Sequence, residues 1–158
     1  MSQTSNRPVD WEALICQYET KLYRAAFAIV GNPQDAEDVV QDAFLKYLER
    51  APVFSCPEQE SAWLMKVTVN RSISITRSIW RRREPLPPDL PACTSAVQEI
   101  EELYALPVQD RATLHLYYYE GYSTKEIASF LKMRPGAVRS KLCRARGKLK
   151  QLLEGESP

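Results

Sequence analysis

The sequence predicts an all-α protein made of two small helical domains. Apolar residues recur at helical spacing in both halves of the chain, and no stretch shows the apolar-polar alternation of a strand or hairpin. Between the halves, four prolines fall within seven residues, at Pro85, Pro87, Pro88 and Pro91. Proline at this density forbids a helix and favours an extended chain. We therefore predict a domain over residues 1–83, a flexible acidic, proline-rich linker over 84–95 and a second domain over 96–158.

Composition excludes several functional classes. Of the 158 residues, 44% are hydrophobic and 26% charged, as in a soluble globular protein, and no apolar run approaches the roughly 18 residues of a membrane span. The N-terminus lacks a basic segment followed by an apolar one, so we expect a cytoplasmic protein without membrane insertion. The single histidine, His115, has no second histidine or reactive cysteine beside it. No two cysteines have CxxC spacing, and we expect neither a metal nor a cofactor.

Three helices are predicted for the first domain. The first spans about residues 11–30 and stops at Gly31, which is followed by Asn32 as N-cap and Pro33 as the first residue of the next helix. That second helix runs to about Arg50, and a third covers roughly residues 61–82 after a loop that contains prolines. The second helix carries one apolar stripe of 3.6-residue period. Its members are Ala36, Val39, Val40, Ala43, Phe44, Tyr47 and Leu48.

The second domain contains a predicted helix-turn-helix. Two helices, over 96–106 and 108–120, precede it and are parted by Pro107. Ser123 and Glu126 have the spacing of a capping box, which begins a short helix that ends near residue 131. Lys132 stands in the turn, where left-handed geometry is expected, and Pro135 can begin a second, longer helix.

Charge distribution points to an anionic partner for this second helix. The chain has a formal net charge of only +1, yet residues 132–150 include eight Lys or Arg and no Asp or Glu. The second helix of such a motif enters the major groove of duplex DNA, where arginine reads guanine, lysine neutralises phosphates and serine donates hydrogen bonds. The candidates nearest its N-terminus are Arg139, Ser140, Lys141 and Arg144. A solvated basic helix in a small bundle is the alternative.

A second basic block, over residues 66–83, has a different composition. It carries six basic residues and no acidic one, interleaved with aromatic and amide side chains. The relevant residues are Trp63, Lys66, Asn70, Arg71, Arg77, Trp80 and Arg81, with Phe54 in the preceding loop. Aromatic faces stack on unpaired bases while cations follow the backbone, so this composition suits single-stranded or opened nucleic acid. Trp63 could equally be a core residue.

Three stretches resemble a known family. NPQDAEDVVQDAFLKYL, SAWLMKVTVNRSI and GYSTKEIASFLKMRPGAVRSKLCRARGKL are similar to regions 2 and 4 of sigma-70 family sigma factors, and the small size resembles the extracytoplasmic-function (ECF) group. The resemblance implies an initiation factor, not an enzyme, that directs core RNA polymerase to promoters. It also implies that the protein is a monomer within the holoenzyme, that it binds the β′ coiled coil and the β subunit, and that an anti-sigma factor could hold it inactive.

The resemblance also assigns residues to partners. Polymerase binding falls on Asp38, Gln41, Asp42 and Leu45. The promoter -10 element falls on Phe54, Trp63, Lys66, Asn70, Arg71 and Arg77, with Phe54 and Asn70 where the family captures a flipped base. The -35 element falls on Arg134, Arg139, Ser140, Lys141, Arg144 and Arg146. The chain departs from the family at Ser74, where an aspartate is common, at Lys132, a frequent glycine, and at Arg134-Pro135.

Two other functions are compatible with parts of this pattern. A stand-alone helix-turn-helix regulator explains the basic C-terminal helix equally well, but it does not explain the first two stretches. An enzyme acting on nucleic acid could use the carboxylates of residues 35–42, but no histidine, cysteine or glycine-rich phosphate loop accompanies them. Binding to core polymerase separates the first alternative from a sigma factor, and metal-dependent DNA cleavage would reveal the second.

Overall fold

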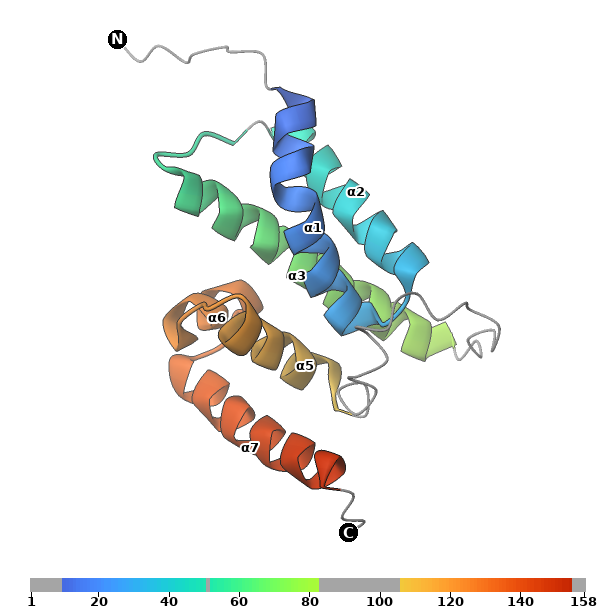
Figure 1. Ribbon diagram of the computed structural model, residues 1–158, viewed down its shortest axis with the longest axis vertical. Helices are drawn as coiled ribbons and strands as arrows, with labels where there is room; N and C mark the ends of the chain where they lie inside the picture. Colours follow the sequence, from blue (N-terminus) through green and yellow to red (C-terminus); the bar gives the residue numbers. More distant parts are fainter. Residues whose placement is uncertain (1–9, 51, 83–105, 155–158) are drawn as a thin grey trace.

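The computed structural model describes residues 10–50, 52–82 and 106–154, and all regular structure in these ranges is helical, as predicted (Figure 1). The helices fall into an N-terminal and a C-terminal group, drawn in blue to green and in yellow to red. In chain order they are α1 (Trp11–Val30), α2 (Pro33–Arg50), α3 (Pro57–Arg82), α5 (Val108–Leu114), the π-helix η2 (His115–Tyr119), α6 (Thr124–Leu131) and α7 (Pro135–Leu153). The predicted linker over 84–95 and the predicted helix over 96–106, apart from Leu106, lie outside the described residues.

The N-terminal group consists of α1, α2 and α3, each packed on the other two. Local signals set the first boundaries. Asp10 caps α1 by accepting a hydrogen bond from the Ala13 backbone, and Gly31 ends it with a φ of 70°, a left-handed conformation that glycine adopts without strain. The Asn32 side chain then accepts from the Gln34 backbone N–H at 2.8 Å, which confirms its predicted capping role.

Two details of the N-terminal prediction were wrong. Helix α3 begins at Pro57 rather than near residue 61, because proline already has helical φ and the next turn closes on the Cys56 carbonyl. Leu48, predicted to be part of the buried stripe of α2, is 58% exposed. The physical reason is rotation: Leu48 follows the buried Tyr47 and is turned about 100° further round the helix.

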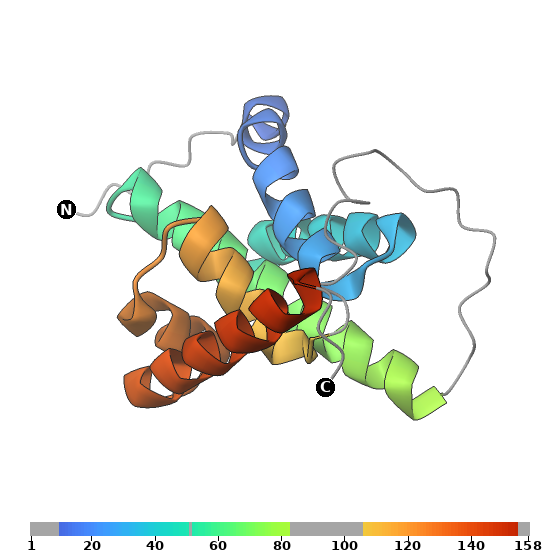
Figure 2. The same ribbon diagram turned by 60° about the horizontal axis from the view of Figure 1, so that its bottom comes forward.

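The C-terminal group departs once from the predicted helices. Residues 108–120 form α5 and then one turn of π-helix, in which the Glu120 backbone N–H reaches back five residues to the His115 carbonyl at 3.0 Å. The wider turn leaves Leu116 in the core and three consecutive tyrosines exposed. Helices α6 and α7 follow and pack on each other, with α7 across the end of the molecule in Figure 2.

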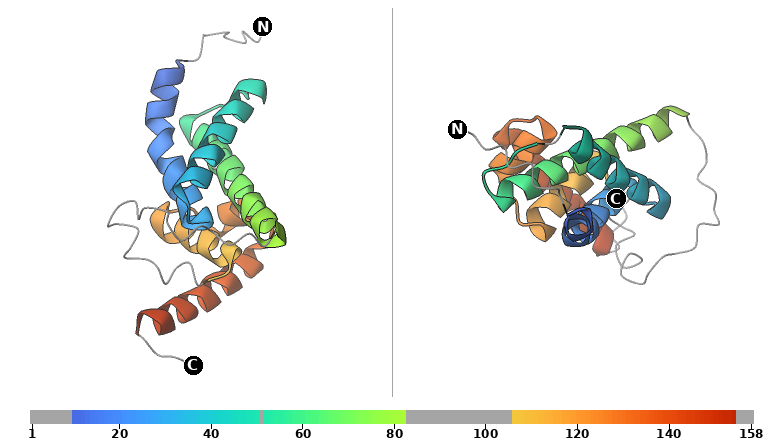
Figure 3. Two further views of the ribbon diagram at one scale, coloured as in Figure 1. Left: turned by 90° about the vertical axis from the view of Figure 1, so that its right-hand side faces the viewer. Right: turned by 90° about the horizontal axis from the view of Figure 1, so that it is seen from above.

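The two groups pack together. Helix α1 contacts α5, and α3 contacts both α5 and α6, as the two views of Figure 3 illustrate. One cluster of buried apolar side chains includes Leu22 and Leu64 from the first group and Leu116 and Ile127 from the second. The buried Arg111 guanidinium of α5 also donates to the carbonyl at Ile29, near the end of α1. The larger cluster of buried apolar side chains therefore spans both groups, and a smaller cluster of Ala26, Phe27, Ala36 and Val39 lies within the N-terminal group.

Candidate nucleic-acid and polymerase interfaces

Helix α7 presents a row of cations to solvent. Its apolar face, formed by Val138, Leu142 and Ala145, is buried against the rest of the C-terminal group. The remaining faces carry most of the predicted DNA-binding set in exposed positions. The exposed members are Arg134, just before the helix, and Arg139, Ser140, Arg144 and Arg146. No acidic residue within α7 neutralises them, so the surface suits an anion.

The turn before α7 is held in place by local hydrogen bonds. Both arms of the capping box at Ser123 and Glu126 are present at the start of α6. Lys132 adopts the predicted left-handed conformation, with φ 55° and ψ 51°, and the Met133 backbone N–H reaches the Ala128 carbonyl at 2.9 Å. A non-glycine residue in this conformation costs about 1 to 2 kcal/mol. Burial of Phe130 and Leu131 in the adjoining helix offsets that cost.

Lys141 differs from its neighbours on α7. Its ammonium lies 3.7 Å from a carboxylate oxygen of Asp110 on α5, and its side chain is only 20% exposed. Lysine carries its charge and its three donors on one nitrogen, so an ammonium held beside the buried Asp110 is less available to DNA than an unpaired one. Of the cations predicted on this helix, Lys141 is the one that forms an ion pair with a carboxylate among the described residues.

The second predicted nucleic-acid surface lies on α3 and the loop before it. Trp63, Lys66, Asn70 and Arg77 are spaced by 3, 4 and 7 residues along one continuous helix, so they share a face. The first three are partly exposed and Arg77 is fully exposed. The early start of α3 brings the loop close, and the ring centroids of Phe54 and Trp63 lie 6.1 Å apart. The structure therefore brings Phe54 and Trp63 together and aligns Lys66, Asn70 and Arg77 further along the same face of α3.

Sequence reasoning missed the aromatic support beneath this surface. The ring of Tyr47, which is buried, lies 5.9 Å from Trp63 and 6.1 Å from Phe54 between centroids. Its hydroxyl donates to Glu60 at 2.8 Å, and Tyr18 donates to the other oxygen of the same carboxylate at 2.8 Å. Burial and the Glu60 contact raise the pKa of Tyr47 to about 12. The aromatic residues clustered in the sequence between Tyr47 and Trp63 were the only available signal.

Helix α2 carries the predicted polymerase contacts on its outer surface. Asp38, Gln41 and Leu45 are exposed, and Leu45 is an apolar side chain with 56% of its surface accessible. Their spacing of three or four residues places them on one face. Asp42 lies beside that face and is 2.9 Å from the Nε of Arg71 on α3. A residue predicted to bind polymerase is thus joined to one predicted to bind DNA.

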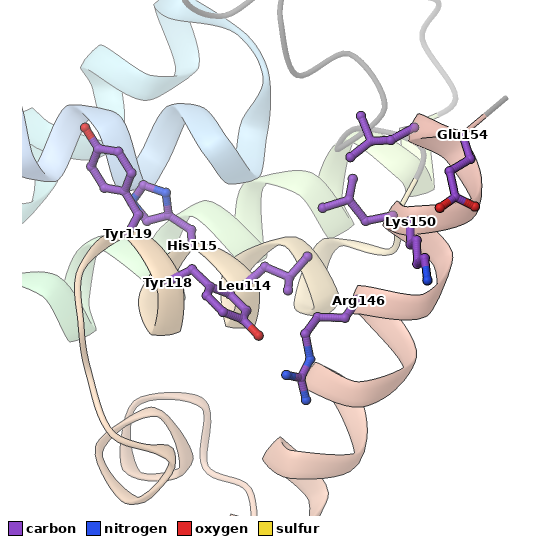
Figure 4. A pocket seen from close by; sticks show the side chains of 9 residues that line it. Leu114, His115, Tyr118, Tyr119, Arg146, Lys150 and Glu154 are labelled. Carbon is purple, nitrogen blue, oxygen red and sulfur yellow. The ribbon is translucent and has the colours of Figure 1, made fainter.

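The C-terminal group also contains an apolar groove that the sequence did not reveal. It has a volume of about 700 Å³ and lies between α5 with η2 on one side and α7 on the other (Figure 4). Its lining includes Leu114, Tyr118, Leu149 and Leu153, with Arg146 facing Tyr118 across it. Arg146, predicted on the DNA-binding surface, therefore lies at the groove. The YYY sequence of η2 was the signal that could have indicated it.

His115 takes part in protein contacts. Its Nε2 lies 3.2 Å from a carboxylate oxygen of Glu120, and its ring stacks on Tyr119 with centroids 4.9 Å apart. Lys21 of α1 approaches the other oxygen of Glu120 at 3.9 Å. Across the described ranges, no group of three His, Cys, Asp or Glu side chains is arranged to hold a metal ion. In the same ranges, no helix is both long and apolar enough to cross a bilayer.

These features define a class of helical protein. Its members have a helix-turn-helix whose second helix is cationic. They also have a separate aromatic and cationic surface that lies beside an exposed acidic helix. Family comparisons agree with that class. Residues 14–82 match the model for sigma-70 region 2, and residues 100–149 match the model for sigma-70 region 4.

Individual relatives lead to the same family. The ECF RNA polymerase sigma factor SigE of Mycolicibacterium smegmatis is 30% identical over 93% of this chain, and SigM of Mycobacterium tuberculosis is 29% identical over 90%. The aligned chain spans 63% of the first relative's length and 76% of the second's.

Solved structures agree in fold. The sigma factor RpoE of Bartonella quintana, solved with the anti-sigma factor NepR, has a TM-score of 0.74 at 22% identity, covering 94% of this chain and 99% of that one. CnrH, solved with the cytosolic domain of CnrY, has a TM-score of 0.66 at 25% identity, covering 93% and 89%. The chain belongs to the sigma-70 family, in the ECF group of sigma factors. Members of this family are initiation factors and not enzymes.

Proposed function

We propose that this chain is a transcription initiation factor that binds core RNA polymerase and directs it to promoters by reading the -10 and -35 elements. One observation carries the proposal: the chain combines two exposed cationic surfaces of different chemistry, on α3 and on α7, with an exposed acidic and apolar face on α2. A protein that binds DNA at a single site would need only the surface on α7.

The proposed -35 reader is α7. Its N-terminal half enters the major groove, where the Arg139 and Arg144 guanidinium groups can each donate two hydrogen bonds to a guanine edge. Ser140 can donate to or accept from a base or phosphate, and Arg134, before the helix, is suited to the backbone. All four side chains are exposed. Lys141 is left out of the proposed base-reading set, because its ammonium forms an ion pair with Asp110.

The proposed -10 reader is the surface of α3 with its preceding loop. Extruding a base from duplex DNA costs a few kcal/mol, and stacking on an aromatic ring with hydrogen bonds to its edge can recover that cost. Phe54 and Trp63 supply the rings, 6.1 Å apart, and Asn70 supplies an amide that can donate and accept. Lys66 and Arg77 lie on the same face and are suited to the phosphates of the opened strand.

Polymerase binding is proposed at two surfaces. The exposed Asp38, Gln41 and Leu45 on α2 would bind the β′ coiled coil, with Asp42 at their edge. The groove between η2 and α7 would bind the β subunit, because its apolar floor flanked by Arg146, Lys150 and Glu154 suits an amphipathic helix. This arrangement leaves the N-terminal half of α7 for DNA.

An anti-sigma factor is a further proposed partner. Two structures of similar fold contain one such factor and the cytosolic domain of CnrY, respectively. In this chain the inhibitor would compete for the same exposed surfaces that we assign to polymerase. A partner of this kind, like the polymerase, would place the protein in the cytoplasm.

The decisive experiment is binding to purified bacterial core polymerase followed by transcription from a promoter library. We expect a stable complex that fires new promoters, and we expect Gln41→Ala or Leu45→Ala to weaken it. Gln17→Ala, an exposed glutamine on α1, is the matched control. Failure to bind several core enzymes, together with good binding to duplex DNA, would instead indicate a stand-alone helix-turn-helix regulator.

A further inference from the structure

The ion pair between α2 and α3 joins two surfaces that have separate proposed functions. The Arg71 Nε donates to an Asp42 carboxylate oxygen at 2.9 Å. The Arg71 side chain remains 43% exposed and that of Asp42 36% exposed. Exposed pairs of this kind contribute little to folding stability, so stability alone gives no reason for the contact.

The ion pair leaves the two terminal nitrogens of the Arg71 guanidinium available for other contacts. Within the described part of the chain, Asp42 engages only the Nε edge of the guanidinium, and the two terminal nitrogens keep their donors. Arg71 follows Asn70 directly and lies about 100° further round α3, on the side next to α2. The guanidinium therefore lies at the edge of the surface that carries Asn70.

An ion pair with a carboxylate fixes the orientation of an arginine side chain. A free arginine side chain loses considerable rotamer entropy when it is fixed on a partner, whereas one already held in place loses less. A guanidinium reads a base edge through two donors at fixed angles, so restriction of its plane favours the matching base over others. An interaction with phosphate depends mainly on charge and gains little from such restriction.

We propose that Asp42 is a positioning residue for promoter readout: its carboxylate holds the Arg71 guanidinium for a sequence-specific contact at the -10 element. This inference rests on the proposed function and extends it. Asp42 then serves DNA recognition as well as polymerase binding. Arg71 contributes to sequence specificity, whereas Lys66 and Arg77 contact the DNA phosphates. The same carboxylate gives polymerase binding a direct route to affect the -10 surface.

The test measures sequence discrimination by preassembled holoenzyme. Core polymerase is supplied in saturating excess, and binding is measured on fork-junction DNA from a -10 library, as the ratio of affinity for the best sequence to the library mean. Asp42→Asn should lower this ratio about two- to fivefold, whereas affinity for unrelated DNA should stay level or rise because a negative charge is lost. Asp42→Glu, which keeps the charge, should recover part of the ratio.

Two controls distinguish positioning from general electrostatics. Glu37→Gln removes a negative charge from the same helix outside the proposed binding residues, and among the described residues Glu37 has no ion pair to an arginine, so its discrimination ratio should not change. In an Arg71→Ala background, Asp42→Asn should have no further effect on the ratio, because the two residues act as one unit.

Several outcomes would overturn the inference. An unchanged ratio in Asp42→Asn, an equal change in Glu37→Gln, or additive effects of Asp42→Asn and Arg71→Ala would each mean that Asp42 does not position Arg71. An increased ratio in Asp42→Asn would mean that the ion pair masks the arginine. Core binding is measured separately, so a holoenzyme that forms but shows one of these results leaves the proposed function intact. Failure of all variants and the wild type to bind core would count against the proposed function itself.

Discussion

The two proposed DNA-binding surfaces, on α3 and on α7, differ in their chemistry. On α7 every charged residue of the exposed face up to Lys150 is cationic, and the other face of the helix is buried in a small apolar core. On α3 the cations are fewer, and they share the face with an amide and with aromatic rings held from beneath by Tyr47 and Glu60. A duplex offers phosphates and base edges but no exposed base faces, whereas an opened strand also offers rings to stack on.

The two surfaces also treat their carboxylate partners differently. Asp42 takes one edge of Arg71 and leaves the rest of the guanidinium free, whereas Asp110 takes the only nitrogen of Lys141. Arginine spreads its donors over three nitrogens in a fixed fork, so one edge can be paired while another faces a partner, whereas a lysine ammonium held by a carboxylate is drawn away from a partner as a whole. The difference teaches that counting basic residues overestimates a DNA-binding surface wherever lysines have acidic neighbours.

The largest expected effect concerns whether the two groups of helices behave as one unit. Ile127→Ala removes a fully buried side chain from the C-terminal group and should lower the free energy of unfolding by about 2 to 5 kcal/mol. All three tryptophans lie in the N-terminal half, so urea unfolding followed by their fluorescence reports on that half alone. If the core is continuous, fluorescence and circular dichroism midpoints shift together. A shift in circular dichroism only would show two independent units.

The next effect tests the Tyr18–Glu60–Tyr47 network beneath the α3 surface. The pKa of Tyr47 is raised from 10.0 to about 12, and that of Tyr18 is also raised, chiefly by burial and then by contact with Glu60. The folded state holds these protons more tightly than the unfolded state does. The contribution of the two tyrosines to the free energy of unfolding is therefore constant below pH 10, and that of Tyr47 is lost as the pH rises through about 12. The loss should be on the order of 2 kcal/mol for Tyr47.

The measurement for this network is urea unfolding between pH 9 and 12, with Tyr47→Phe as the variant. That variant should be less stable at neutral pH by about 1 to 2 kcal/mol, because Glu60 loses a donor, but its stability should fall less at high pH. Tyr117→Phe, at an exposed tyrosine of η2 outside this network, is the control. An identical alkaline loss in Tyr47→Phe and the wild type would rule out this tyrosine as its source.

A third effect separates base readout from phosphate contact on α7. Arg144→Ala should cost about 1 to 3 kcal/mol at one base pair of the -35 element, whereas Lys148→Ala should weaken all sequences alike and reduce the salt dependence of binding. Both side chains are exposed and neither has an ion pair among the described residues. Binding to matched and mismatched duplexes decides the matter. Equal losses on both duplexes for Arg144→Ala would remove it from the base-reading set.

The smallest expected effect on DNA binding is at Lys141. Lys141→Ala should change duplex affinity less than Arg139→Ala does, because its ammonium is already engaged by Asp110. It should instead lower the free energy of unfolding by about 1 to 3 kcal/mol, since a buried carboxylate loses its partner. Duplex binding and urea unfolding of the two variants measure this contrast. A loss of DNA affinity as large as that of Arg139→Ala would return Lys141 to the DNA-binding set.

The sequence by itself determined the helices and many of their boundaries. The end of α1 at Gly31, the start of α2 at Asn32 and Pro33, the capping box at Ser123 and the left-handed Lys132 were all predicted and are present. These features depend on backbone hydrogen bonds and φ preferences within a few residues of one another, so local sequence contains the information. The outward direction of Asp38, Gln41 and Leu45 followed in the same way from helical periodicity.

Only the tertiary structure decided which side chains face one another across helices. Asp42 pairs with Arg71, Asp110 pairs with Lys141, and Tyr18 and Tyr47 share one carboxylate. The partners in these pairs are 13 to 42 residues apart, and charge or ring type alone matches each of them equally well with many others. Packing of buried apolar faces fixes which turns of two helices meet, and the polar contacts follow from that alignment.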